Sequence, residues 1–394
     1  MRVLILSHMY PSPINPVAGI FVCQQVEALL DQEVDLRVVS PRPSVPAMAK
    51  AASRKWKQTS RVPPSAGVGR VDVRYPRFRV YPRALLLANS GVRMYRGVSE
   101  SIRVTHRKGP FDLIHAHVAL PDGYAAMLLS RDLSIPYVVT IHGADLQNTI
   151  HRGVACRKAI GQALSGAAKI IVVSSKLLGL VDQHFGLAGK TVVIPNGVNP
   201  ESVCQSGGEE IDGRIMLSVS NLIPTKGIDL NIEAIAALKD AYPDLTYRIV
   251  GAGAEEKKLR RLAAEKGIAD RVFFLGQLPH ARVMEEMAKC TFFSLPSWQE
   301  GFGVVYLEAM ASGKPVIGCR GEGIEDFVEH GKTGVLVEPQ DTPGLVEAID
   351  RVLGNADGAE GIGRSGHKWV LSNLTWARNA QKTIAVYEGV LRGS

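Results

Sequence analysis

Two carboxylates eight positions apart, Glu300 and Glu308, lie in a glycine-rich segment of the second half of the chain. The apolar run before Glu300 predicts a strand, and residues 303–312 predict a helix that begins at the glycines. N–H groups at the start of a helix have no partner within it and carry a partial positive charge, so they suit a phosphate. Because carboxylates accept hydrogen bonds from vicinal hydroxyls, the segment predicts a sugar-nucleotide site. The spacing alone would equally fit two solvated glutamates.

A histidine closes a predicted strand in the first half of the chain. Residues 137–142 form a short apolar run that ends in His142, and Gly143 follows it. Ligands of open α/β sheets bind outside the carboxyl ends of the strands, so His142 is placed to reach a substrate. Asp145, in the same loop, is a candidate acceptor or base contact. The alternative for His142 is a loop histidine satisfied by its surroundings.

A neighbouring strand, predicted over residues 113–117, carries His115 and His117. We expect these two side chains to face opposite sides of the sheet, so that only one reaches the ligand edge. His117, at the strand end, is the better candidate for an acceptor-side residue. Asp122, in the loop that follows, is a further candidate contact.

The chain has no pattern that predicts a resident metal or cofactor. It contains no Asp-x-Asp pair for a Mg²⁺–diphosphate bridge and no His/Cys ligand spacing. The five cysteines lie far apart without a C-x-x-C pair, which is typical of a reducing compartment. We therefore expect helix N-termini, glycine amides and a lysine to stabilise the charge of a leaving diphosphate.

The elements that position these residues alternate between short apolar runs and amphipathic stretches. This alternation indicates an α/β fold with parallel sheets covered on both faces. A chain of 394 residues has room for roughly two to three domains. Turn residues near 195–197 mark a break, so we expect doubly wound, Rossmann-like domains over 1–197 and 198–375, facing a central cleft. A last helix within 376–394 would pack away from the second sheet and could cross back to the first domain.

The two halves of the chain differ in charge. The net charge of +8 divides into +14 over residues 1–197 and −6 over the remainder. Residues 50–108 hold 15 basic and two acidic side chains. This excess suggests a polyanionic partner for the first half, although an arginine-rich solvated loop would have the same composition. The hydrophobic content of 46% excludes disorder as the main state, and no run of about 20 apolar residues predicts a membrane span.

The segment from Glu300 to Glu308 also resembles a known sequence block. Its pattern E-G-F-G-x-x-x-x-E-A-M-A-x-G-x-P-V-I is similar to the EX7E block of retaining glycosyltransferase family 4, or glycosyl transferases group 1. The resemblance implies the GT-B fold and a surface-polysaccharide type of bacterial enzyme. Further segments that resemble the family are Tyr10–Phe21, 194–198, 218–227, 250–253, 274–276 and 331–339.

The resemblance implies roles for individual residues. Glu308 would bind the ribose hydroxyls of the donor, Glu300 the donor sugar, and Lys226 the diphosphate, for which a compact ammonium at a loop tip is apt. His142 would position the sugar or the acceptor. The implied donor-binding residues are Gly19, Asn221, Lys226, Glu300, Gly301, Phe302, Gly303, Val304 and Glu308. The implied catalytic residues are His142 and Glu300, with His117 and Asp145 on the acceptor side and no metal ligand.

Two positions depart from the family pattern. Asn221 stands where the family usually has an arginine, so a fixed bidentate phosphate contact is missing. Either Lys226 carries more of the charge, or another cation such as Arg320 compensates. Ala18 precedes Gly19, so the usual Gly-Gly pair of the first loop is absent, and Gly19 could be a turn glycine without a ligand.

By this resemblance we expect a retaining, metal-independent hexosyltransferase. Its donor would be a nucleotide sugar, with UDP-sugars favoured and GDP-mannose as the alternative. Its acceptor would be a glycan or a lipid-linked molecule of surface polysaccharide or glycolipid biosynthesis. A GT-B sugar-nucleotide epimerase is the competing interpretation. A nucleic-acid partner is not expected, because the basic stretch contains no compact recognition module.

Aromatic residues lie among the arginines of residues 50–108. Trp56, Tyr75, Phe78 and Tyr81 would suit an anionic membrane surface, because aromatic rings favour the headgroup region and cations the anionic lipid. We therefore expect a cytoplasmic protein that is peripheral on the cytoplasmic face of the membrane.

Overall fold

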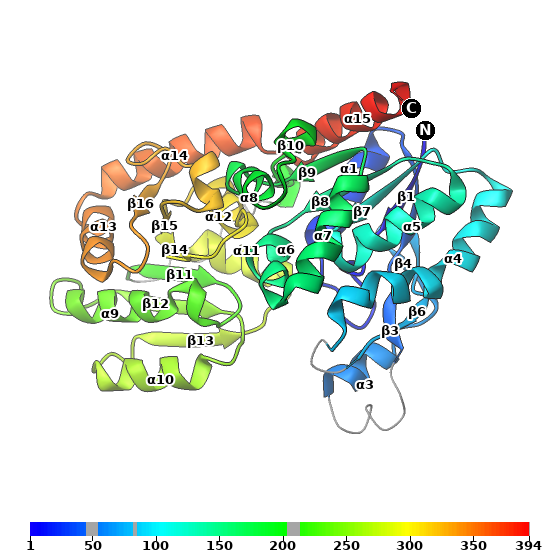
Figure 1. Cartoon of the computed structure of the whole chain (residues 1–394). Coiled ribbons are helices and arrows are strands. Elements are labelled where there is room, and N and C mark those ends of the chain that lie inside the picture. The colour runs from blue at the N-terminus through cyan, green and yellow to red at the C-terminus, as the bar shows by residue number, and fades with distance from the viewer. Residues whose placement is uncertain (45–53, 82–84, 203–212, 394) are drawn as a thin grey trace. The chain divides into compact units, whose positions relative to one another are not determined.

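The structure of the protein is a computed structural model that describes residues 1–44, 54–81, 85–202 and 213–393. The described residues form two compact units, which are labelled by element in Figure 1. One unit is Met1–Asn196 together with Trp376–Ser394, and the other is Gly197–Thr375. The chain therefore leaves the first unit, builds the second and returns to the first. The break between the units falls one residue before the predicted boundary.

The first unit is built on an eight-stranded sheet with the strand order β10-β9-β8-β7-β1-β2-β5-β4. Neighbouring strands are parallel except β4 and β5. Its strands are β1 (Arg2–Leu6), β2 (Asp35–Val39), β4 (Ser65–Val68), β5 (Val71–Arg74), β7 (Leu113–His117), β8 (Tyr137–Ile141), β9 (Lys169–Val172) and β10 (Thr191–Val193). A separate parallel pair consists of β3 (Arg42–Ser44) and β6 (Arg77–Arg79).

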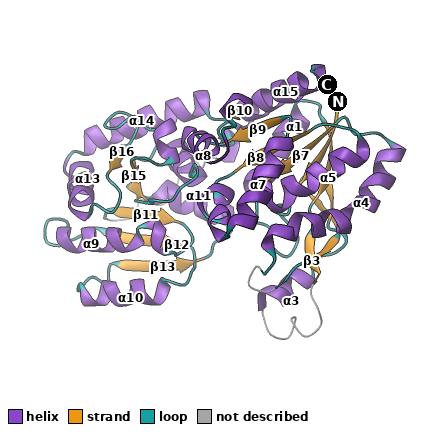
Figure 2. Cartoon of the chain, viewed as in Figure 1, coloured by secondary structure: helices purple, strands orange, loops and turns teal. Residues whose placement is uncertain are grey.

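Helices cover both faces of this sheet, as Figure 2 shows in purple. The helices of this unit are α1 (Ile20–Asp31), α3 (Arg54–Ser60), α4 (Ser90–Lys108), α5 (Tyr124–Leu133), α6 (Ala144–Gln147), α7 (Val154–Gly166), α8 (Ser175–Phe185) and α15 (Trp376–Arg392), of which α3 lies beside β3. Val3 and Ile5 of β1 join one buried cluster with apolar side chains of α1 and α15. The central strands β7 and β8 are buried along their whole length, as expected for parallel strands covered on both faces.

The second unit contains a six-stranded parallel sheet with the order β13-β12-β11-β14-β15-β16. Its strands are β11 (Ile215–Val219), β12 (Thr246–Val250), β13 (Val272–Gly276), β14 (Phe292–Ser294), β15 (Val316–Cys319) and β16 (Val335–Val337). Its helices are α9 (Ile228–Leu238), α10 (Glu256–Glu265), α11 (His280–Lys289), α12 (Val304–Ala311), α13 (Thr342–Gly354) and α14 (Ala356–Asn373). Both units are thus Rossmann-like α/β folds, as the sequence predicts.

The basic stretch of residues 50–108 forms elements that the sequence analysis did not predict, among them α4 and strands β4 to β6. The structure also corrects the proposed role of its aromatic residues. Tyr75 and Phe78 are buried, and the Tyr75 hydroxyl donates to the Pro11 carbonyl at 2.8 Å. Arg70 forms ion pairs with Glu27 and Asp31. Part of the basic, aromatic composition therefore serves packing within the unit.

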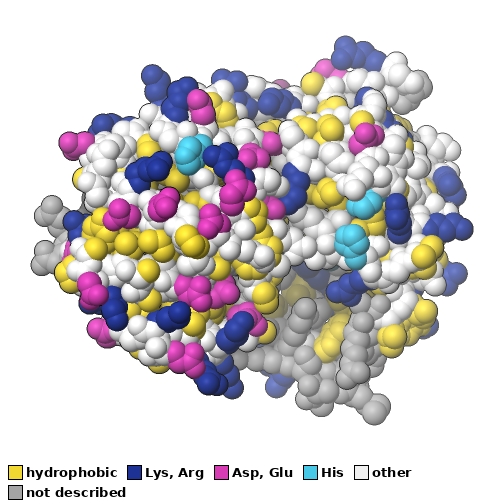
Figure 3. Space-filling view, turned by 60° about the vertical axis from the view of Figure 1, so that its left-hand side comes forward, with side chains coloured by type: hydrophobic (Ala, Val, Ile, Leu, Met, Phe, Trp, Pro, Cys, Tyr) yellow, Lys and Arg dark blue, Asp and Glu magenta, His cyan; other side chains and the backbone are white. Residues whose placement is uncertain are grey.

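Acidic and basic side chains lie next to one another on the face of the molecule shown in Figure 3. No helix in the described part of the chain combines the length and the apolar composition needed to cross a bilayer.

Candidate functional site

The loop from β14 to α12 carries Glu300 and the glycines that follow it. Gly303 has φ 85° directly before α12, a left-handed conformation that favours glycine. A Cβ at this position would lie 2.4 Å from the ring of Tyr306, which is fully buried. The backbone therefore enters the helix along a path open only to glycine. This path leaves the first-turn N–H groups at the carboxyl edge of the sheet.

Lys226 and Glu300, which the resemblance assigns to the diphosphate and the sugar of a donor, contact each other. The Lys226 Nζ donates to the Glu300 Oε2 at 2.5 Å, and the two side chains are 16% and 17% exposed. Their loops are joined by the Trp298 N–H, which donates to the Thr225 carbonyl at 3.1 Å. An ammonium has three N–H donors, so pairing with Glu300 leaves donors of Lys226 for an anion.

Two close backbone contacts join these loops to each other and to the loop after β12. Gly227 has φ 66°, and a Cβ there would lie 2.5 Å from the Pro296 carbonyl oxygen. Gly251, at the end of β12, has φ 133°, and its Cβ would meet the Ser220 carbonyl at 1.8 Å. The loops after β11, β12 and β14 thus pack backbone against backbone.

Glu308 has a partner that the sequence analysis missed. Its Oε1 accepts a hydrogen bond from the Nε2 of His280, the first residue of α11, at 2.7 Å. This hydrogen bond raises the pKa of His280, and burial opposes the shift. Glu308 is 15% exposed, so it keeps an accessible edge at the second turn of α12. The sequence shows His280 only as a helix start, 28 residues from Glu308.

Glu322 is a second residue that the sequence analysis did not single out as a contact. Its Oε2 accepts from the Glu300 backbone N–H at 2.6 Å, and it is buried. A Cβ on the neighbouring Gly323 would lie 2.4 Å from the Gly301 carbonyl oxygen. The loop after β15 therefore packs against the Glu300 loop and fixes its backbone.

The remaining predicted donor-side residues divide into packing and exposed positions. Phe302 is buried, and its ring packs on Phe327 with centroids 5.1 Å apart. Val304 is half-buried and Asn221 is exposed. Arg320 does not approach the Lys226 pair in any contact of the described residues. It forms ion pairs with Glu325 and Glu338 at 4.0 and 3.4 Å, so its charge is already balanced.

The carboxyl edge of the first sheet carries a row of histidines. The rings of His115 and His117 stack with centroids 4.4 Å apart, and His117 Nδ1 lies 3.1 Å from His142 Nε2. The expectation that His115 and His117 face opposite sides of the sheet was wrong, because residues two apart on a strand share a face. His115 also contacts the Tyr387 hydroxyl of α15 and the Thr140 hydroxyl, at 2.5 and 2.7 Å.

These histidines are held in the neutral state. Burial lowers the pKa of His115 and of His142 to about 3. Burial also lowers the pKa of His117 well below its usual value, and the neighbouring histidines add to the effect. His142 is half-buried and packs against the ring of Phe21, with centroids 4.6 Å apart. A neutral imidazole can both donate and accept, which suits a residue that orients hydroxyl groups.

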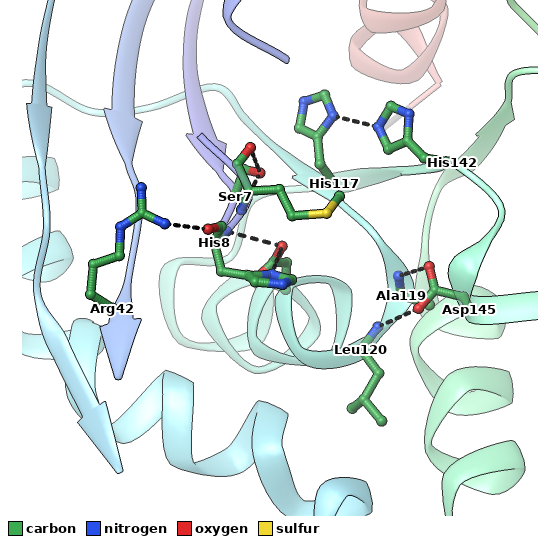
Figure 4. Close-up of polar contacts among 10 residues, drawn as sticks. Ser7, His8, Arg42, His117, Ala119, Leu120, His142 and Asp145 are labelled. Atoms are coloured by element: carbon green, nitrogen blue, oxygen red, sulfur yellow. Dashed lines mark hydrogen bonds and ion pairs between the residues drawn. The ribbon is translucent and has the colours of Figure 1, made fainter. Parts of the chain in front are cut away.

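A second cluster on this edge contains His8 and Asp122, and the sequence analysis missed His8. The Asp122 Oδ2 accepts from the His8 backbone N–H at 3.2 Å and lies 2.8 Å from its Nδ1. Arg42 donates to the His8 carbonyl at 2.6 Å and fixes the loop from behind, as Figure 4 shows. Asp122 is fully buried, whereas the His8 side chain is 36% exposed. Asp122 thus holds an imidazole that faces solvent.

Asp145 supports the backbone at this edge. Its carboxylate accepts from the N–H groups of Ala119 and Leu120 at 3.0 and 3.4 Å, and Figure 4 shows it directed at them. Burial raises the pKa of Asp145 to about 6. In this arrangement the side chain holds the turn after β7, where the sequence analysis proposed an acceptor contact.

Gly19 has a structural reason to be glycine. Its φ is 68° at the start of α1, and a Cβ would lie 2.3 Å from the Met9 carbonyl oxygen. The first loop therefore folds directly against the helix start, with or without a ligand. Within the described ranges, no three His, Cys, Asp or Glu side chains gather closely enough to hold a metal ion.

Two family models match this sequence. Residues 18–202 match the model described as Glycosyltransferase Family 4, and residues 204–369 match Glycosyl transferases group 1.

Curated relatives extend the similarity over most of the chain. An uncharacterised glycosyltransferase of Methanocaldococcus jannaschii is 34% identical over 70% of this chain and 75% of its own length. A Bacillus subtilis protein, provisionally assigned as a teichuronic acid biosynthesis glycosyltransferase, is 30% identical over 89% of both chains. A GDP-mannose-dependent phosphatidylinositol monomannoside mannosyltransferase of Mycolicibacterium smegmatis is 31% identical over 45% of this chain and 48% of its own.

Solved structures share the fold of the chain. Sucrose-phosphate synthase from Thermosynechococcus elongatus matches with a TM-score of 0.81 at 22% identity, over all of both chains. The Anabaena protein HepE, solved with UDP and glucose, matches with a TM-score of 0.74 at 20% identity over 99% of this chain and 100% of its own.

Proposed function

The chain belongs to the group 1 glycosyltransferases of family 4, with the GT-B fold, and from that premise we propose that it is a retaining, metal-independent hexosyltransferase that uses a nucleotide sugar. One observation carries the donor part of the proposal. The Lys226–Glu300 pair, the first turn of α12 and Glu308 all lie at the carboxyl edge of one parallel sheet. That edge is where α/β sheets bind ligands.

Each of these groups fits one part of a nucleotide sugar. Glu308 accepts hydrogen bonds from the ribose hydroxyls, and Glu300 accepts from hydroxyls of the donor sugar. The Lys226 ammonium and the N–H groups of residues 301–304 stabilise the diphosphate as its charge grows on bond breaking. Asn221 is exposed and Arg320 is paired elsewhere, so Lys226 carries the charge that an arginine would otherwise share.

The transfer exchanges one C–O bond for another at the sugar. The bond from the anomeric carbon to the diphosphate breaks, and an acceptor oxygen forms a new bond to that carbon on the same face. The leaving phosphate oxygen takes the proton of the acceptor hydroxyl, and the positive charge at the sugar resembles that of glycoside hydrolysis. His142 positions the sugar or the acceptor, and His117, which contacts it, orients that ring.

A UDP-sugar is the favoured donor, because the Anabaena neighbour was solved with UDP and glucose, and GDP-mannose is the alternative that the mycobacterial relative uses. The acceptor is a glycan or a lipid-linked molecule of surface polysaccharide or glycolipid synthesis. The Bacillus relative, assigned to teichuronic acid synthesis, and the mycobacterial relative, which acts on a phosphatidylinositol mannoside, support this class of acceptor.

A nucleotide panel tests the donor site. We expect UDP or GDP, but not both equally, to stabilise the protein in EDTA, by about 2.7 kcal/mol at a hundredfold excess over Kd. Glu308→Ala should abolish this gain, because the ribose contact is lost. The control is Glu329→Ala, which changes an exposed glutamate paired with Lys332 in the same unit. A requirement for Mg²⁺, or equal stabilisation of the Glu308→Ala variant, would contradict the site. Epimerised donor formed without acceptor would favour the epimerase.

Peripheral membrane binding is the remaining part of the proposal. Tyr81, Leu85 and Leu86 are 45%, 64% and 61% exposed and lie in the basic stretch. We expect the double change Leu85→Ser, Leu86→Ser to lower flotation with anionic vesicles at least fivefold at low salt, because two apolar contacts are lost. The matched control is Val154→Ser, an 85% exposed valine of the same unit. No flotation of the unaltered protein would remove membrane binding from the proposal.

A further inference from the structure

A cavity of about 300 Å³ lies in the first unit, beneath the C-terminal half of α4 and over β1, β2 and β5. Four cations line it, Arg2, Arg37, Arg74 and Lys108, against one acid, Asp72. The histidine row, His8 and Gly19 do not belong to its lining. The cavity is therefore separate from the candidate-site residues of the same sheet.

The cations of this cavity are only partly neutralised. Arg74 donates to the Thr105 hydroxyl at 3.3 Å, which leaves its charge unbalanced. Arg2 Nε lies 3.2 Å from Asp35 Oδ2, yet it is buried and donates no hydrogen bond. No contact of Arg37 or Lys108 with an acid is present among the described residues. Like charges gathered around one hollow destabilise a fold unless an anion offsets them.

Arg2 is also held in place, and two exposed arginines stand on the same face of the sheet. The Arg2 guanidinium lies over the Phe111 ring, 5.2 Å from its centroid, and packs so closely on Gly109 that a Cβ there would overlap it. Arg37 and Arg74 stand on neighbouring strands, where Val39 pairs with Arg74 and Leu4 with Arg37. Planar guanidinium groups on one face of a sheet match the several acceptor oxygens of a phosphate.

We propose that this cavity is a second anion site, which binds a phosphate dianion independently of the nucleotide. The ligand is either a soluble phosphate ester or the phosphate of a lipid headgroup, and both present the same tetrahedral group. The aliphatic floor formed by Leu4, Val39 and Ile102 leaves room for the organic part of either.

Calorimetric titration of the full chain with inorganic phosphate, at constant ionic strength, tests the site. The titration uses the Lys226→Ala background, so that phosphate at the proposed donor site does not contribute. We expect saturable binding that Arg37→Gln and Arg74→Gln each weaken at least fivefold. Arg152→Gln, which changes an exposed arginine of the same unit, should leave it unchanged. Absence of binding, or equal binding by all variants, would overturn the proposal.

Vesicles then distinguish the two sources of phosphate. Phosphatidylcholine vesicles with and without phosphatidic acid are compared for the unaltered chain and the Arg37→Gln, Arg74→Gln double variant. Loss of phosphatidic-acid-dependent binding in the double variant would assign the site to a lipid headgroup. Unchanged vesicle binding, together with weakened binding of inorganic phosphate, would assign it to a soluble ester. Circular dichroism of each variant excludes unfolding as the cause.

Discussion

Lys226→Ala is expected to lower kcat/KM for the nucleotide sugar by about 10²–10³-fold, or roughly 2.7–4 kcal/mol of transition-state stabilisation. The physical reason is that a partly buried ammonium stabilises charge that grows on the diphosphate, in a place where Asn221 supplies no formal charge. The change also leaves the Glu300 carboxylate, 17% exposed, without its cation. Most of the loss should fall on kcat, because the charge develops as the bond breaks.

Two further variants make the Lys226 test specific. Lys332→Ala removes an exposed lysine that pairs with Glu329 in the same unit, and it should leave kcat/KM unchanged. Asn221→Arg should tighten binding of the nucleoside diphosphate and partly restore the Lys226→Ala variant, because it supplies a second cation. Full activity of Lys226→Ala would show that the diphosphate binds elsewhere.

The first unit is expected to lose stability in mild acid. The unfolded chain protonates its histidines near pH 6.5, whereas the folded pKa of His115 and of His142 is about 3. Below pH 6.5 the unfolded state therefore binds more protons, and the free energy of unfolding falls as the pH falls. Each of these histidines lowers the free energy of unfolding at pH 5 by about 2 kcal/mol relative to pH 8.

Other groups on the same edge act in the opposite direction. Protonation of Asp145, whose folded pKa is about 6, raises the free energy of unfolding by roughly 1.4 kcal/mol between pH 8 and pH 5, because the folded state binds the proton more tightly. The pKa values of Asp122 and His8 are also raised, so these groups likewise add stability as the pH falls. The histidine effect is therefore best isolated as a difference between variants.

His115→Gln isolates one of these histidines. The variant should be less stable at pH 8, because the contacts with Tyr387 and Thr140 change. Its loss of stability between pH 8 and pH 5 should nevertheless be about 2 kcal/mol smaller than that of the unaltered protein. Urea denaturation at both pH values measures the two quantities, and His151→Gln, an exposed position, is the control. The same pH dependence in His115→Gln would mean that His115 is protonated in the folded state.

The sequence predicted the local features well, because they depend on neighbouring residues. Strand and helix positions in the second half follow from apolar periodicity, and the glycine turn before α12 follows from its composition. The sequence did not predict which residues contact them in the folded protein. His280 reaches Glu308, Glu322 reaches the Glu300 backbone, and Asp122 reaches His8 from 114 residues away. Such contacts depend on which loops meet at one edge of a sheet.

Two errors have separate causes. The side of the sheet assigned to His115 and His117 was wrong because the two-residue period of a strand was misapplied. The aromatic residues of the basic stretch were assigned to a surface from composition alone, although Tyr75, between β5 and β6, and Phe78, on β6, are buried. Composition reports which residues are present, but burial is decided by the elements that carry them.

The return of α15 to the first unit has a consequence for synthesis. Tyr387 and Trp376 of α15 complete a cluster most of whose members, such as Val3 and Val22, are made earlier. During translation the second unit and α15 must therefore be made before this early-made layer can close. Until then the nascent chain exposes an apolar surface of the kind that chaperones bind. The second unit, whose core does not include α15, folds without this delay.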